Sequence, residues 1–120
     1  MGQTPGFRVE VDRSRLPRAV IITVAGELDY DTSPRLLDAA GGPPPAGASL
    51  IIDAHELAFC DSSALGAMIN LRAAATGGGG RLYVTGVQPQ VLSAIRVTSL
   101  DELLMIRDDV PAALAELDSR

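Results

Sequence analysis

The sequence predicts a single α/β domain, in which a mixed sheet of four or five strands carries helices mainly on one face. The chain has 120 residues, of which 47% are hydrophobic, and this suits one domain with one core. Short β-branched runs alternate with longer runs of helical periodicity, which is typical of a partly parallel sheet covered by helices. A short polar connection between the first two strands favours an antiparallel hairpin there.

The two strands of this hairpin differ in the burial that their patterns predict. Residues 7–11 alternate apolar and polar side chains, which indicates a half-buried strand. Residues 20–25 are β-branched and almost entirely apolar, which is typical of a strand buried on both faces. The turn-rich residues 1–6 predict a disordered tail on a domain that spans residues 1–120.

A first helix is predicted after the second strand. Ser33 and Pro34 fit its N-cap and first helical residue, because a serine hydroxyl accepts a free backbone N–H and proline has none to leave unpaired. This helix directs Leu36 and Leu37 inward. It stops before the glycine- and proline-rich residues 41–45, which we interpret as a loop.

The second half of the chain repeats this alternation. In its longest helix, four residues recur at helical spacing, so we expect one face of this helix in the core: Leu65, Met68, Ile69 and Arg72. Pro89 opens a later helix, again as a first-turn proline. The elements predicted in this half are a strand at 49–53, a helix from 62 to about 76, a strand at 81–85, a helix from 89, a short extended segment at 103–106 and a terminal helix from 109 to about 117.

Composition argues against several classes of function. A net charge of −5, with two Phe, two Tyr and no Trp, leaves little basic or stacking surface for nucleic acid. All ten basic residues are arginine, so the lysine of a P-loop and the lysine of a Schiff base are both missing. Cys60 and His55 are the only residues of their types, which leaves no disulfide and no Cys/His metal cluster.

The distribution of apolar residues bears on membrane insertion and on cellular location. No apolar run reaches the roughly 18 residues of a membrane span. We therefore expect a cytoplasmic monomer with no cofactor and no metal, and with neither nucleic acid nor membrane among its partners.

Asp61, Ser62 and Ser63 stand where the longest helix is predicted to begin, and two interpretations of them are open. Such residues commonly act only as an N-cap, which contributes about 1 kcal/mol. A helix N-terminus also offers free N–H groups and a positive dipole end, which favour a dianionic phosphate by about 0.3–1 kcal/mol. A phosphorylated Ser62 would then leave the fold intact and change only the surface.

Acidic residues also follow the predicted strand ends. Asp29, Asp31, Asp53 and Asp61 either form turns or gather at one edge of the sheet. A gathered pair would bind Mg²⁺, as in phosphoryl-accepting receiver domains. Those domains also use a lysine, which this chain lacks, so the magnesium interpretation is the weaker one.

Three other features have plain structural interpretations. The four glycines at 77–80 follow a helix and precede a strand, which is the reverse of a phosphate-binding loop, so they predict a helix stop and a turn. His55 is expected in a loop after its strand. Cys60 lies next to Phe59 in an apolar context and is expected to be buried.

Three segments together resemble the STAS-domain anti-sigma factor antagonists, also named anti-anti-sigma factors. Residues 26–29 read G-E-L-D, residues 59–66 read F-C-D-S-S-A-L-G after the strand L-I-I-D, and residues 79–84 read G-G-R-L-Y-V. Their order and spacing match over about residues 7–117. Ala64 stands where the family usually has glycine. The resemblance implies a STAS-like domain.

The resemblance also implies a mechanism. The unphosphorylated protein would bind an anti-sigma factor that is also a serine kinase with a histidine-kinase-like ATPase fold, and so free a sigma factor. The kinase would phosphorylate Ser62, with Ser63 the less favoured acceptor, and a metal-dependent serine phosphatase would reverse this. The chain would be a switch and no enzyme. The positions that the resemblance assigns to the partner surface are Asp29, Asp61, Ser63, Ala64, Leu65 and Gly66.

Two other functions stay open on the sequence. STAS domains also serve as small scaffold subunits of transport or signalling assemblies, without a phosphorylation cycle. An enzyme has poor support, because one histidine and no lysine leave few groups for acid–base or covalent chemistry.

Overall fold

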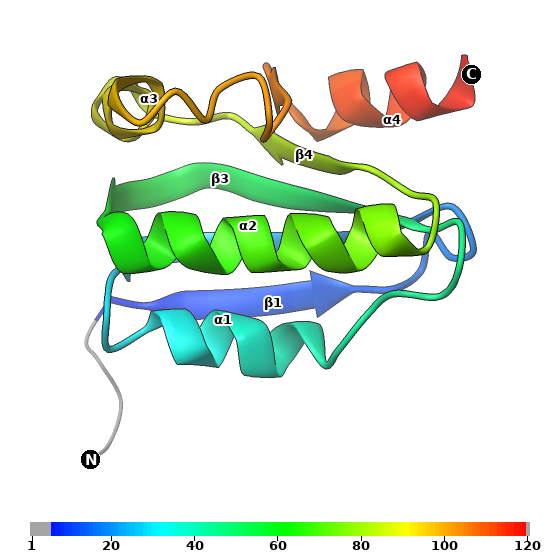
Figure 1. Ribbon diagram of the computed structural model, residues 1–120, viewed down its shortest axis with the longest axis horizontal. Helices are drawn as coiled ribbons and strands as arrows, with labels where there is room; N and C mark the ends of the chain where they lie inside the picture. Colours follow the sequence, from blue (N-terminus) through cyan, green and yellow to red (C-terminus); the bar gives the residue numbers. More distant parts are fainter. Residues whose placement is uncertain (1–5, 120) are drawn as a thin grey trace.

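The computed structural model describes residues 6–119, and these form one mixed sheet of five strands in the order β1-β2-β3-β4-β5 (Figure 1). The first pair is antiparallel and the later pairs are parallel, as the hairpin and the alternation predicted. The tail expected at residues 1–6 lies, apart from Gly6, outside the described residues. The strands are β1 (Arg8–Asp12), β2 (Ala19–Leu28), β3 (Ser49–Cys60), β4 (Leu82–Thr85) and β5 (Ile106–Arg107).

Helices cover the two faces of the sheet unequally. The main core joins the sheet to the first three helices, while a second cluster places the last helix on the opposite face. The prediction of helices mainly on one face is therefore confirmed. Figure 1 shows α1 and α2 running alongside each other across the sheet. The helices are α1 (Ser33–Ala40), α2 (Ser62–Gly77), α3 (Pro89–Val97) and α4 (Val110–Asp118).

Strand β2 shows why this arrangement follows from the sequence. Successive side chains of a strand point to opposite faces, so a strand that is apolar throughout must be covered on both sides. Ile22 and Val24 face the three-helix layer and are fully buried. Ile21 faces α4 and is 8% exposed.

The predicted end of β3 is wrong. The strand was expected to stop at Asp53, with His55 in a loop, but it continues to Cys60. It does so because β2 also extends to Leu28 and pairs with it through two register shifts, which leave His55 and Glu56 both exposed. Cys60 is 7% exposed, so its predicted burial is confirmed.

The predicted core face of α2 is partly wrong. Leu65 and Met68 are buried as expected, but Ile69 is 37% exposed. The buried stripe continues instead through Leu71 and Ala75, because these positions face β3 and β4, whereas Ile69 lies on the solvent side of the helix. Periodicity identified the helix and misjudged which of two adjacent apolar residues faces the sheet.

An ion-paired cluster holds α4 against the second face of the sheet. Arg107 of β5 donates two hydrogen bonds to the Glu116 carboxylate, at 2.6 Å from Nε and 2.9 Å from Nη2. Tyr83, which is fully buried, donates its hydroxyl to the same carboxylate at 3.2 Å. These hydrogen bonds lower the pKa of the Glu116 carboxyl, with Arg107 as the main cause.

This cluster predicts an acid-sensitive contribution to stability. Because the folded pKa of Glu116 is lowered, the ion pair stabilises the fold fully above about pH 4.3, the ordinary glutamate value, and less as the pH falls through the lowered pKa. We expect the difference in urea midpoint between wild type and Glu116→Gln to be largest near neutral pH and to shrink below about pH 4. Glu102→Gln, at an exposed position that forms no ion pair within residues 6–119, is the control. A difference that does not change with pH would contradict this account.

Candidate functional site

The carboxylate of Asp61 joins two segments at one end of the sheet. Asp61 is the N-cap of α2, and its Oδ1 accepts a hydrogen bond from the Ala64 N–H at 3.0 Å. Its Oδ2 accepts a hydrogen bond from the Tyr30 N–H at 3.2 Å. One side chain therefore fixes the start of α2 relative to the connection between β2 and α1. The N-cap interpretation of Asp61 is confirmed.

Ser62 is the first residue of α2, and its side chain is exposed. Its hydroxyl forms no hydrogen bond within residues 6–119, so it is accessible to another molecule. Ser63 is half-buried and lies against α1. Of the two predicted acceptors, the structure thus presents Ser62 to solvent more fully than Ser63.

Asp29 organises the neighbouring turn. Its Oδ1 accepts hydrogen bonds from the Asp31 N–H at 3.0 Å and from the Thr32 N–H at 3.1 Å. The Thr32 hydroxyl accepts the Asp29 N–H at 2.8 Å and donates to the Glu27 carbonyl at 2.9 Å. The turn-forming interpretation of Asp29 is confirmed. The N-cap of α1 is Thr32, and Ser33, the predicted cap, is the first helical residue.

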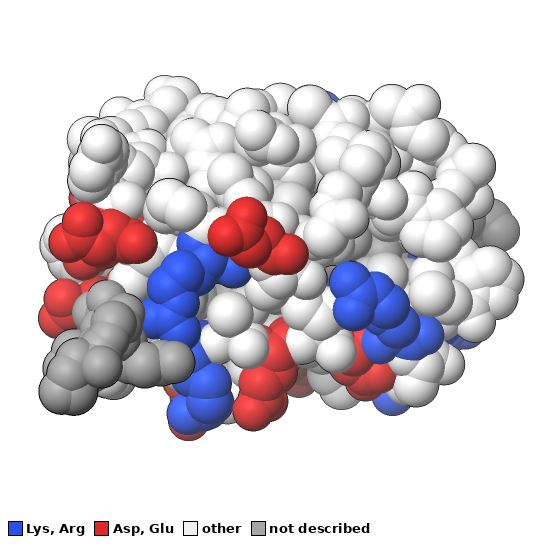
Figure 2. Space-filling model, turned by 90° about the horizontal axis from the view of Figure 1, so that it is seen from below, with Lys and Arg blue, Asp and Glu red and all other residues white. Residues whose placement is uncertain are grey.

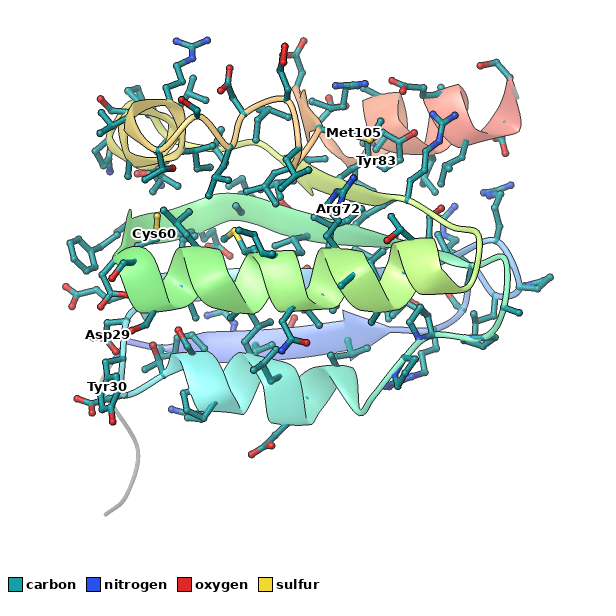
Figure 3. All side chains as sticks on the ribbon, in the orientation of Figure 1. Asp29, Tyr30, Cys60, Arg72, Tyr83 and Met105 are labelled. Carbon is teal, nitrogen blue, oxygen red and sulfur yellow. The ribbon has the colours of Figure 1, made fainter. Side chains whose placement is uncertain are left out.

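The four aspartates of the magnesium hypothesis do not act as one group. Asp29 and Asp61 flank Tyr30, whose exposed side chain lies at this end of the molecule (Figure 3). Asp53 instead accepts a hydrogen bond from His55, with 2.7 Å between Oδ1 and Nδ1, and this contact raises the pKa of the His55 ring. Among the described residues no three metal-ligating side chains come together.

Two positions expected on the partner surface are buried. The Ala64 side chain is fully buried and that of Leu65 is 6% exposed, because the third and fourth residues of α2 face the sheet. The expectation that these two side chains form exposed surface is therefore wrong. For Leu65 the structure agrees with the core position that helical spacing predicts. Gly66 is exposed, as expected.

An apolar hollow of about 280 Å³ lies beside Ser63, between α1 and α2. It adjoins a second hollow of about 340 Å³, which shares Leu37 and Asn70 with it. We name this pair of hollows the α1–α2 groove. Among the residues that line its first part are Tyr30, Pro34, Leu37, Ser63, Gly66 and Asn70.

Two exposed aromatic residues near Ser62 were missed by the sequence analysis. Tyr30 is 78% exposed and lines the α1–α2 groove, and Phe59 is 47% exposed at the end of β3. The sequence feature that could have identified Tyr30 is its position between Asp29 and Asp31. A large aromatic residue in such a polar connection is expected to stay on the surface.

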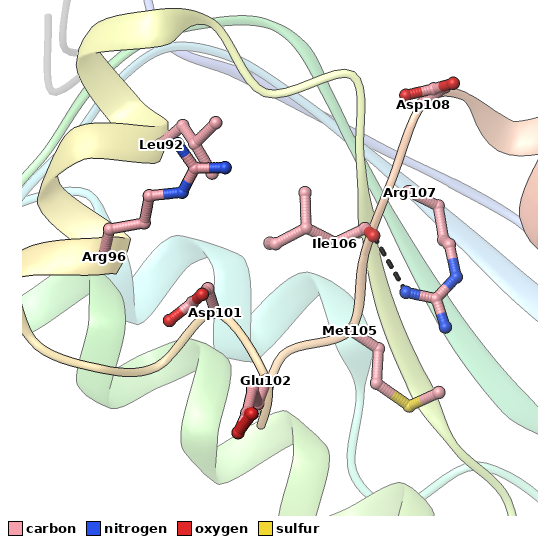
Figure 4. Close-up of a pocket in the computed structure, with 8 residues that line it drawn as sticks. All are labelled: Leu92, Arg96, Asp101, Glu102, Met105, Ile106, Arg107 and Asp108. Carbon is pink, nitrogen blue, oxygen red and sulfur yellow. Dashed lines mark hydrogen bonds between the residues drawn. The ribbon is translucent and has the colours of Figure 1, made fainter.

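A larger hollow of about 730 Å³ lies between α3 and β5 (Figure 4). Its lining is mixed: Leu92 and Ile106 are apolar, while Arg96 and Asp101 carry opposite charges. Arg107 on its wall donates a hydrogen bond to the carbonyl of Ile106 at 2.9 Å. None of the predicted site residues lines it.

Loss of the Asp61 carboxylate is predicted to weaken the fold modestly. Asp61→Ala removes the cap of α2 and the hydrogen bond to Tyr30, and we expect it to lower the free energy of unfolding by about 1–2 kcal/mol. Asp31→Ala, which removes an exposed carboxylate that accepts no hydrogen bond within the described residues, should change it by less than about 0.5 kcal/mol. Urea unfolding of the two variants measures this. Equal effects would mean that Asp61 does not couple the two segments.

Comparison with known proteins identifies the family. The family model described as "Mlab, STAS domain" matches residues 5–107, which is most of the chain. The chain belongs to the STAS-domain family. The match ends at β5, so α4 follows the part that the family model covers. No curated protein matches this STAS domain significantly.

Solved structures share the fold at low sequence identity. An anti-sigma factor antagonist from Mycobacterium paratuberculosis is 23% identical with a TM-score of 0.76, covering 97% of this chain and 98% of that chain. The antagonist SpoIIAA in its unphosphorylated form is 20% identical with a TM-score of 0.75, covering 95% and 97%. The murine anion transporter Slc26a9 is 14% identical with a TM-score of 0.74, covering 99% of this chain but 23% of that one. At these identities the likeness shows the fold alone.

STAS domains are in general binding domains and not enzymes. Across residues 6–119, every helix is too short or too polar to span a lipid bilayer.

Proposed function

We propose that this STAS domain is a cytoplasmic anti-sigma factor antagonist that is switched by phosphorylation of Ser62. In this proposal the unphosphorylated protein binds an anti-sigma factor with serine kinase activity and a histidine-kinase-like ATPase fold. Binding frees a sigma factor, phosphorylation releases the kinase, and a metal-dependent serine phosphatase resets the switch. The chain itself performs no catalysis. The observation that carries the proposal is the exposed, unpaired hydroxyl of Ser62 on the first turn of α2.

Phosphorylation at this position is compatible with the folded domain. The phosphate would stand at the N-terminus of α2, where the helix dipole favours negative charge by about 0.3–1 kcal/mol. The Ser62 hydroxyl forms no hydrogen bond with residues 6–119, so its modification removes no hydrogen bond from the described part of the fold. The modification therefore changes the surface and leaves the core as it is.

The same phosphate would oppose a close interface. A bound kinase has to seat against the first turn of α2 to reach Ser62, and the new dianion would then be removed from water without a cation prepared for it. The kinase also brings the anionic phosphates of its nucleotide to the same hydroxyl, so the product phosphate faces like charge. Loss of about 3–4 kcal/mol corresponds to roughly 150- to 900-fold weaker binding.

Mass spectrometry after incubation with the cognate kinase and ATP tests the proposal. Phosphate on Ser62 of the wild type, and none on Ser62→Ala, is the expected result. Ser63→Ala is the matched control and should still be modified, since Ser63 is the less exposed hydroxyl. Phosphate at another position with Ser62 unmodified would exclude the switch.

A second candidate function has a specific observation behind it. The matching family model is described as Mlab, and a similar domain forms part of a murine anion transporter. A non-phosphorylated scaffold subunit of a transport or signalling assembly would fit these likenesses. A pull-down with the tagged chain separates the two: recovery of a transporter ATPase favours the scaffold, and recovery of a histidine-kinase-like ATPase favours the antagonist.

A further inference from the structure

Gly66 lies inside α2 although the fold does not require a glycine there. Glycine is the least favourable helix residue after proline, so an interior glycine needs a reason. At Gly66 an added Cβ would meet no atom of residues 6–119 within 4 Å, so no described neighbour excludes a methyl group there. The missing side chain instead keeps the α1–α2 groove open on its α2 side. This indicates close approach by another molecule.

The groove runs between α1 and α2 and has apolar walls. Its two hollows follow one another along the space between α1 and α2, with Leu37 and Asn70 common to both. Leu37, Ala67 and Leu71 supply apolar walls, and Tyr30 stands at the mouth with 78% of its surface exposed. An amphipathic helix commonly binds in such a groove through its apolar face, and exposed tyrosines are frequent anchors of interfaces.

The charges near this mouth indicate which kind of helix fits. Glu27, Asp29 and Asp31 carry carboxylates at the end of the domain where Tyr30 lies, and we name them the acidic mouth. None of them forms an ion pair with another residue between 6 and 119. Figure 2 shows acidic side chains at the left end of the face that it presents, arginine side chains beside them, and a broad part of that face without charge. An apolar groove beside carboxylates that form no ion pair among the described residues is complementary to a basic amphipathic helix.

We infer that the α1–α2 groove binds an amphipathic helix of the anti-sigma factor kinase, with its apolar face against Gly66 and Leu37 and its basic side chains over the acidic mouth. This inference rests on the proposed function, since it names the contact that holds the kinase while Ser62 is presented. The cations face the connection between β2 and α1, whereas the phosphate would stand on the first turn of α2. Phosphorylation is therefore still expected to oppose close packing, because the cost of removing a dianion from water can exceed its attraction to cations across the interface.

Filling the groove tests the inference with a variant that keeps its fold. Gly66→Leu places a side chain in the groove, and its thermal midpoint should equal or exceed that of wild type, because leucine favours helix over glycine. We expect binding to the kinase to weaken by at least about tenfold. Ala73→Leu adds a leucine to the exposed side of α2 outside the groove, and it should bind within about twofold of wild type. Unchanged binding by Gly66→Leu would overturn the inference even where wild-type Ser62 is phosphorylated.

A second experiment tests the same inference without the kinase. Two synthetic helical peptides carry leucine along one face and either lysine or glutamate along the other. We expect the lysine peptide to shift the amide NMR signals of Gly66 and Asn70 in wild type, less so at high salt, and to have no effect in Gly66→Leu. The glutamate peptide should leave them unchanged. Equal shifts from both peptides, or shifts confined to other surfaces, would overturn the inference, whereas failure of the kinase to modify Ser62 would overturn only the proposed function.

Discussion

Replacing Ser62 with glutamate is expected to weaken binding to the anti-sigma factor kinase by at least about 30-fold, which corresponds to about 2 kcal/mol. Glutamate places one negative charge on the first turn of α2, where the partner has to approach closely. Burial of a charge without a partner costs free energy that the hydroxyl of Ser62 does not. Because the side chain is exposed and its hydroxyl forms no hydrogen bond within residues 6–119, the fold should be unaffected.

Two other substitutions in α2 serve as controls for Ser62→Glu. Ser62→Ala should bind as tightly as wild type and remain unphosphorylated, because it removes only the acceptor hydroxyl. Ala73→Glu adds the same charge to the exposed side of α2 away from Ser62 and should weaken binding by less than about threefold. Titration calorimetry with the purified kinase measures all three. Tight binding by Ser62→Glu would show that charge at this turn does not control release.

The second large effect is expected for Gly80→Ala, which should lower the free energy of unfolding by about 3 kcal/mol. Gly80 precedes β4, where its backbone approaches β3 so closely that an added Cβ would overlap the carbonyl oxygen of Ala48. The approach is fixed, since the Arg81 carbonyl accepts a hydrogen bond from the Leu50 N–H at 2.8 Å. The clash is with backbone, which cannot move aside without breaking the pairing of β3 with β4.

Gly66→Ala is the matched substitution, and it is expected to raise the free energy of unfolding where Gly80→Ala lowers it. The added methyl meets no atom within 4 Å, and alanine favours helix over glycine by up to about 1 kcal/mol, so this variant should be more stable than wild type. Urea unfolding of both variants tests the pair. Destabilisation of similar size at the two positions would contradict the distinction between a glycine required by the fold and one that is not.

Local sequence patterns located the elements but not all of their limits. The β-branched run from Val20 and the helix opened by Pro89 were predicted from a few neighbouring residues, and both are present. The extension of β3 through His55 was not predicted, because it depends on the pairing of β3 with β2, which no local pattern records. The exposure of Ile69 was missed for a similar reason, because helical periodicity does not say which apolar residue meets the sheet.

The candidate site was likewise predicted in part. The D-S-S motif placed Ser62 and its capping aspartate at the start of a helix, and the structure confirms both positions. Burial of Ala64 was not predicted, since the motif does not specify the orientation of the helix on its sheet. No local pattern indicates that Asp61 accepts a hydrogen bond from Tyr30, a residue 31 positions away.

The amino-acid sequence alone specifies the order of strands and helices, the capped start of α2 and the absence of lysine and of a Cys/His cluster. These follow from propensity, periodicity and composition, which act over a few residues. The packed fold was needed to show that Asp61 joins two segments, that Gly66 borders a groove and that Gly80 lies against the backbone of Ala48. This is because burial, close approach and hydrogen bonding across the sheet depend on how distant segments are placed, and many local sequences are compatible with each placement.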